Sequence, residues 1–93
     1  MSDKKDLPVK VSDEVLRGVY ANQMVVRHTR EEFVLDFLNL FPPTAVVTSR
    51  VVVSPGHVKR ILSAIQDNLR KYETQFGPVP DIAAPAPPDG YTN

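Results

Sequence analysis

The segment from Ser54 to Pro78 most constrains the fold, because it carries signals for both ends of one long helix. Ser54 is a suitable N-cap, and Pro55 suits the first helical position, which needs no backbone N–H. Gly77 allows the left-handed conformation that ends helices, and Pro78 prevents continuation. Apolar side chains recur between these ends at the spacing of one helical face: Val58, Ile61, Leu62, Ile65, Leu69, Tyr72 and Phe76. A helix with a single apolar face needs an apolar surface to pack against.

The residues before this helix predict that surface. Residues 19–28, 32–41 and 44–53 are rich in Val, Leu and Phe and read as three strands. Short connections, the second of them a pair of prolines, favour antiparallel hairpins. The predicted fold is therefore α+β: a three-stranded antiparallel meander followed by one long C-terminal helix packed on the sheet, with flexible termini.

Charged residues within the strands indicate the register. A tight second hairpin places Asp36 opposite Arg50, and a tight first hairpin places Arg27 opposite Glu32. Both pairings join opposite charges, which favours this register over its alternatives. The sheet face expected to receive the helix then carries Met24, Val26, Phe33, Leu35, Phe37, Val47, Val51 and Val53.

The other sheet face is more apolar than a solvated face should be, because such faces normally alternate to polar residues. We expect a second copy of the chain to cover it, with Asp36 and Arg50 as a structural ion pair there. The alternative is that residues before Gly18, including Val15 and Leu16, cover part of it. The expected oligomer interface comprises Val19, Ala21, Val25, Val34, Asp36, Leu38, Leu40, Val46, Arg50 and Val52.

Chain length also favours an oligomer, most simply a homodimer. The 93 residues predict a flexible N-terminal segment (1–14), one domain (15–77) and a Pro-rich flexible tail (78–93). A domain of this size is marginally stable alone, and the absence of cysteine excludes disulfides and thiolate–metal sites. The tail is either a polyproline recognition segment or a plain flexible tail.

The charge balance does not favour nucleic-acid binding, since 11 basic and 11 acidic side chains cancel. A polar amino terminus and the lack of a long apolar stretch predict a cytoplasmic protein with no membrane contact. The alternative function is nucleic-acid association through basic residues on the helix and near the first turn: Arg27, Arg30, Lys59, Arg60, Arg70 and Lys71.

Catalytic and metal chemistry find little support. The only histidines, His28 and His57, show no ligand spacing, so we expect neither a metal nor another cofactor. Asp36 and Arg50 fit a catalytic acid and a substrate-binding cation, but no nucleophile–base pair accompanies them, and we expect no enzyme.

Several separated strings carry a family resemblance. They are Tyr20-Ala21-Asn22, Val26-Arg27-His28-Thr29, Glu32-Phe33-Val34-Leu35-Asp36-Phe37, Ser49-Arg50-Val51, Ser54-Pro55-x-His57-x-x-Arg60 and Asn68-x-x-x-Tyr72-Glu73-x-x-Phe76-Gly77. Residues 19–77 thereby resemble a bacterial domain-of-unknown-function family, numbered 3467. This resemblance implies no catalytic or ligand residues. The order of sheet and long helix also resembles, loosely, SecB-type export chaperones. We therefore expect a non-enzymatic oligomeric interaction protein, an adaptor or a chaperone-like binder of protein partners.

Overall fold

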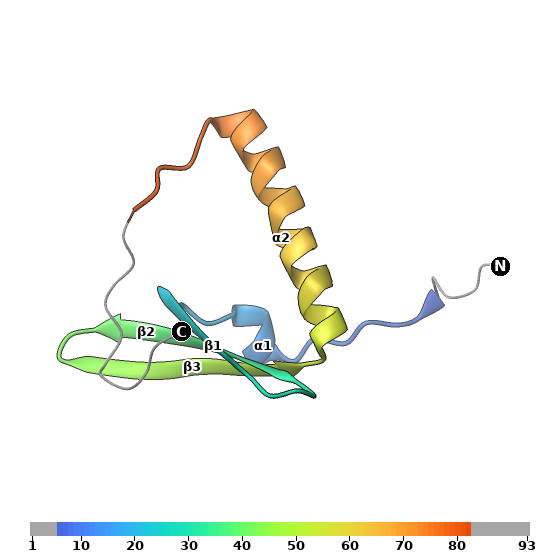
Figure 1. Cartoon of the computed structure of the whole chain (residues 1–93), viewed down its shortest axis with the longest axis vertical. Helices are drawn as coiled ribbons and strands as arrows, with labels where there is room; N and C mark the ends of the chain where they lie inside the picture. Colours follow the sequence, from blue (N-terminus) through green and yellow to red (C-terminus); the bar gives the residue numbers. More distant parts are fainter. Residues whose placement is uncertain (1–5, 83–93) are drawn as a thin grey trace.

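The computed structural model of the chain describes residues 6–82, and its elements follow the predicted order. A short helix α1 precedes the antiparallel sheet β1-β2-β3, and the long helix α2 follows it (Figure 1). The predicted α+β meander with a C-terminal helix is confirmed. No helix within residues 6–82 is both long and apolar enough to cross a membrane. The bounds are α1 Asp13–Arg17, β1 Gln23–His28, β2 Phe33–Phe41, β3 Thr44–Val53 and α2 Pro55–Phe76.

Both ends of α2 form as the sequence predicts. The Ser54 hydroxyl accepts a hydrogen bond from the backbone N–H of His57 at 3.2 Å, and Pro55 opens the helix. Gly77 has a φ of 95°, and its N–H donates to the carbonyl of Glu73 at 2.9 Å. The helix is therefore delimited by local chemistry.

We expect Ser54→Ala to lower the free energy of unfolding by about 1 kcal/mol, because it removes the side-chain acceptor at the start of α2. Urea unfolding followed by circular dichroism measures this. Ser63→Ala, at an exposed position within α2, is the matched control and should leave stability unchanged or slightly raised. Equal losses in the two variants would show that Ser54 does not act as a cap.

The first strand is shorter than predicted, since β1 begins at Gln23 rather than at residue 19. Just before β1, the side chain of Asn22 makes the hydrogen bonds to β2 that the backbone of a further strand residue would otherwise make. Its Nδ2 donates to the carbonyl of Leu40 at 3.0 Å, and its Oδ1 accepts from the N–H of Leu40 at 2.9 Å. An amide side chain thus extends the pairing of β1 with β2 by one step.

The two hairpins match the predicted register to different extents. Asp36 lies opposite Arg50, as predicted. Arg27 lies opposite Val34 rather than Glu32, because the turn is centred one residue later. The hydroxyl of Thr29 fixes this turn by accepting from the N–H groups of Glu31 and Glu32, both at 3.3 Å. A displacement of two residues keeps each β1 side chain on its predicted face.

A β-bulge in β3 changes the faces near the second turn. The register shifts between Phe37 and Leu38, which leaves Thr48 as an extra residue whose hydroxyl donates to the carbonyl of Phe37 at 3.1 Å. Beyond it, Val47 lies opposite Leu38 and Val46 lies opposite Asn39. The predicted faces of Val46 and Val47 are therefore exchanged, because one extra residue inverts the alternation.

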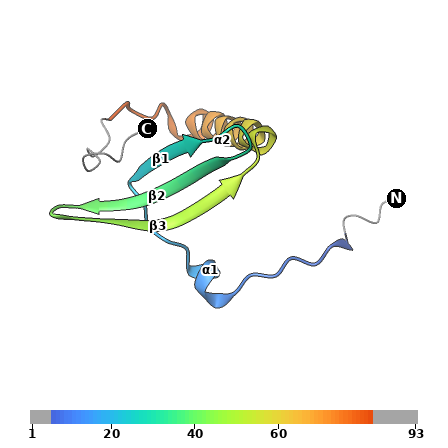
Figure 2. The ribbon, with the colours of Figure 1, turned by 60° about the horizontal axis from the view of Figure 1, so that its bottom comes forward.

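The buried apolar cluster lies on the face that carries Asp36, which we call the arginine face because Arg27 and Arg50 also lie on it. Val25 and Leu38 are each only 1% exposed, and Leu40 belongs to the same cluster. These residues were expected at an oligomer interface, but one chain already buries them. Val15 and Leu16, which the sequence offers as an alternative cover for this face, are themselves exposed, and α1 stands apart from the sheet (Figure 2).

Candidate functional site

A groove lies between α2 and the other face of the sheet, which we call the groove face. Its volume is about 640 Å³, and its walls are almost entirely apolar. The helix and the sheet face that were predicted to meet supply these walls. The sheet contributes Met24, Val26, Leu35 and Phe37, the helix contributes Val58, Ile61, Leu62 and Ile65, and Ala21, Asn22 and Gln23 complete the lining.

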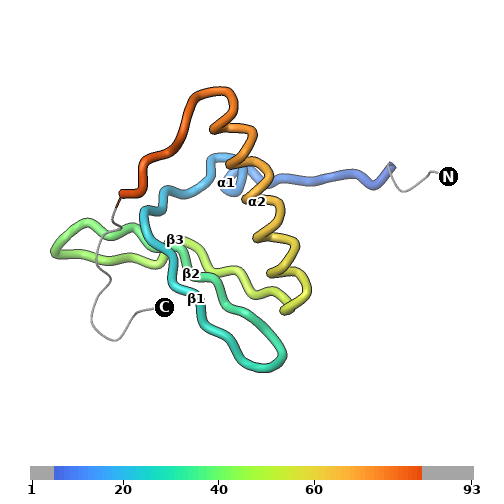
Figure 3. Tube along the Cα trace, turned by 45° about the horizontal axis from the view of Figure 1, so that its top comes forward, coloured from blue at the N-terminus to red at the C-terminus, as the bar shows by residue number. Residues whose placement is uncertain are grey.

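The groove exists because α2 packs on the sheet only near its start. Val58 and Ile61 are half-buried, whereas no residue of the whole helix is fully buried. From the end of β3 the helix rises away from the strands (Figures 1 and 3). The five large apolar side chains farther along its inner face keep 45 to 66% of their surface exposed: Leu62, Ile65, Leu69, Tyr72 and Phe76. The predicted packing of helix on sheet is thus limited to the first turns.

The apolar surface continues beyond the groove to the end of the helix. A second, shallower hollow of about 550 Å³ is lined by Ala64, Ile65, Asn68, Leu69 and Tyr72. The rings of Tyr72 and Phe76 lie against each other with centroids 4.9 Å apart. One continuous apolar stripe therefore follows α2 from Val58 to Phe76.

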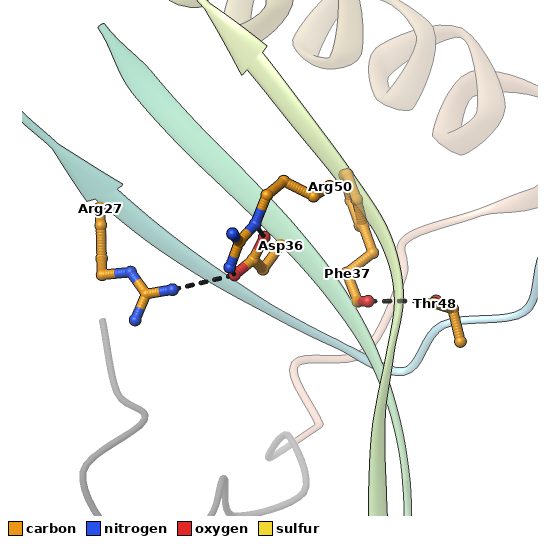
Figure 4. Close-up of polar contacts among 5 residues, drawn as sticks. All are labelled: Arg27, Asp36, Phe37, Thr48 and Arg50. Carbon is orange, nitrogen blue, oxygen red and sulfur yellow. Dashed lines mark hydrogen bonds and ion pairs between the residues drawn. The ribbon is translucent and has the colours of Figure 1, made fainter.

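An ion cluster occupies the arginine face of the sheet (Figure 4). Asp36 is fully buried, and its two carboxylate oxygens accept from Nε and Nη2 of Arg50 at 2.7 and 2.8 Å. Arg27 Nη2 donates to the same carboxylate at 3.0 Å, and both arginines remain about half-exposed. Burying a carboxylate is costly unless it is paired and hydrogen-bonded. The cluster therefore ties all three strands together.

One comparison with known proteins gives a match. The model of a family described as "Protein of unknown function (DUF3467)" matches residues 1–81. The chain belongs to the DUF3467 family. No curated protein and no solved structure matches it. A function for this DUF3467 chain must therefore be inferred from its structure.

The predicted oligomer interface of the DUF3467 chain does not form one exposed patch. Three of its members, Val25, Leu38 and Leu40, are buried within the chain, whereas Val52 on the same face and Val19 before β1 are exposed. Ala21 lines the groove, and Val46 lies opposite Asn39, away from the arginine face. The predicted Asp36–Arg50 ion pair is present, and it joins β2 to β3 as the predicted hairpin requires.

The predicted basic residues are distributed over three elements. Arg27 binds Asp36 on the sheet, and Arg30 lies in the turn between β1 and β2. On α2, Arg70 Nη1 lies 3.0 Å from Asp67 Oδ1, and the remaining cations, Lys59, Arg60 and Lys71, are exposed. The structure therefore does not gather the predicted nucleic-acid residues on one element.

The histidines have local roles. The ring of His28 stacks on Phe33, with centroids 5.3 Å apart, and the backbone of His57 completes the cap of α2. Within residues 6–82, no three His, Asp or Glu side chains gather as a metal site would require. The polyproline segment at residues 85–88 lies outside the described residues.

Two contributions escaped the sequence reasoning. Arg27 joins Asp36 because Val25 lies opposite Asp36, which makes Arg27 its diagonal neighbour on the same face. The predicted register, with its first turn one residue too early, placed Arg27 opposite Glu32 and so did not bring it next to Asp36. Asn22 was noted only as part of a family string, and its role in pairing with Leu40 depends on where β1 begins.

Proposed function

We propose that this protein is a non-enzymatic interaction protein of the bacterial cytoplasm that binds protein partners through the groove and the apolar stripe of α2. The observation that carries the proposal is the exposure of five large apolar side chains on one helix face. Complete burial of such a side chain contributes about 1.5–3 kcal/mol, so a partner that covers several of them gains substantial binding free energy.

The chemistry of the surface favours a protein partner over a nucleic acid. A nucleic-acid site needs cations placed to meet successive phosphates, together with aromatic rings for stacking on single strands. The groove has almost entirely apolar walls, with Phe37 as the one aromatic residue of its lining, and the cations of α2 are outside that lining. An apolar segment or face of another polypeptide has the complementary chemistry.

Fluorescence anisotropy with labelled, reduced and carboxymethylated α-lactalbumin, a permanently unfolded protein, tests this proposal. We expect binding to change less than about twofold between 50 and 500 mM NaCl, because apolar contacts are weakly screened. Leu69→Asp should weaken binding at least about tenfold, which is 1.4 kcal/mol or more. Ser63→Asp adds the same charge elsewhere on α2 and should have little effect.

A labelled single-stranded DNA 20-mer in the same salt series distinguishes the alternative. Steep loss of DNA binding with salt, abolished by Lys59→Glu with Arg60→Glu, would replace the proposal with nucleic-acid association. If α-lactalbumin does not bind, or binds Leu69→Asp equally well, the proposed surface is wrong.

A further inference from the structure

We propose that a second copy of this chain occupies the groove, so that α2 of each copy lays its apolar stripe against the groove face of its partner. This inference rests on the apolar surface of the proposed function and names a second copy as its resident occupant, which a protein partner displaces when it binds. It also moves the expected homodimer interface from the arginine face to the opposite side of the sheet.

The first argument is the lack of packing for α2 within one chain. Its 22 residues span about 33 Å, yet only Val58 and Ile61 near its start reach half-burial against the sheet. Helices in proteins owe most of their stability to packing of an apolar face. A helix of this length with five exposed apolar side chains therefore needs a cover from outside its own chain.

The link between β3 and α2 explains why the chain does not supply that cover itself. Val53 ends β3 and Pro55 begins α2, so Ser54 alone connects them, in an extended conformation with φ −74° and ψ 158°. Pro55 has a fixed φ, so the backbone angles of Ser54 set the direction in which the helix leaves the strand. The helix is thereby directed away from its own sheet, and exchange of an element between identical copies is a low-cost route to a dimer.

The second argument is self-complementarity. The stripe and the groove face are both apolar, and every chain carries one of each. A twofold arrangement uses each surface once per copy and forms two equivalent contacts, which closes the assembly at two chains. The opposite side of α2 carries Lys59, Arg60, Asp67, Arg70 and Lys71, and it remains in solvent. The charged side explains why such a dimer does not grow further.

The available area matches what a dimer needs. The exposed parts of the five helical side chains, with those of Met24 and Val51 on the groove face, amount to roughly 700 Å² per chain. A standard stable interface buries about 800 Å² per partner. Within residues 6–82 only four apolar side chains are buried in one chain: Val25, Leu35, Leu38 and Leu40. A domain with so small a core is marginally stable, and a second apolar core between two copies would raise its free energy of unfolding.

Light-scattering mass behind size exclusion, on the full chain from 5 to 200 µM, tests the inference. We expect twice 10.4 kDa for the native sequence and 10.4 kDa for Leu69→Asp at all concentrations. Tyr72→Gln is a milder second variant that should shift the dimer dissociation constant by at least about tenfold. Circular dichroism verifies that the sheet persists in each variant.

Two matched variants locate the interface. Ser63→Asp on the charged side of α2 and Val52→Asp on the arginine face should both remain dimeric, because neither position lies on the proposed contact. A monomeric native chain, a dimer unaffected by Leu69→Asp and Tyr72→Gln, or a dimer lost only in Val52→Asp would each overturn the inference.

The same variants separate this inference from the proposed function. A monomeric native chain that still binds α-lactalbumin through Leu69 overturns the dimer and leaves the function in place. A dimer that depends on Leu69 but does not bind α-lactalbumin overturns the function and supports the dimer.

Discussion

Asp36→Asn is expected to lower the free energy of unfolding by about 3 kcal/mol, the largest effect of any single polar substitution proposed for this chain. The carboxylate is fully buried and accepts three charge-assisted hydrogen bonds, two from Arg50 and one from Arg27. The asparagine side chain has the same shape as aspartate, but its NH₂ group is a hydrogen-bond donor and would face the N–H donors of an arginine. Urea unfolding, with the slope of the transition compared between variants, measures the loss.

The chain contains a matched control for this prediction. Asp67 also lies 3.0 Å from an arginine, Arg70, but both side chains are exposed on α2. Asp67→Asn should therefore cost less than about 0.5 kcal/mol, because solvent weakens the attraction at the surface. If the two substitutions have equal effects, burial of Asp36 does not determine the strength of its ion pairs.

Leu38→Ala is expected to cost about 3 kcal/mol, because it opens a cavity in the buried cluster on the arginine face. Leu16→Ala makes the same chemical change at an exposed position in α1 and should be nearly neutral. Chemical denaturation of both variants at one protein concentration provides the comparison, since any dimer dissociation would add a concentration dependence.

This pair of substitutions also tests which sheet face is the core. If Leu38→Ala proves neutral, the arginine face is not buried in solution, and the stability of the domain must come from the groove side. The leucine pair therefore decides between the observed core and the one that the sequence predicted.

The parts of the fold that local chemistry determines could be predicted from the sequence. Ser54, Pro55 and Gly77 act within one helical turn of their positions, so α2 begins and ends where expected. The Asp36–Arg50 pair was also predictable, because the antiparallel pairing of β2 with β3 is strongly restricted by a short turn.

Other parts depend on information that the side-chain pattern lacks. The bulge at Thr48 occurs without a glycine or a proline inside β3, so no residue that is typical of a break in a strand indicates it. The sequence supplies two apolar sheet faces and does not state which one a single chain buries. The angle of α2, and with it the groove, is set by the backbone at Ser54 and cannot be deduced from helical spacing.

The single residue between β3 and α2 also has a mechanical consequence. A rigid rod attached at one end amplifies small rotations, and α2 is a rod of about 33 Å. A change of about 10° at Ser54 moves the far end of the helix, near Phe76, by roughly 6 Å. The distance between the two walls of the groove therefore depends on the backbone angles of Ser54, and a small change in the twist of β3 would alter what the groove admits.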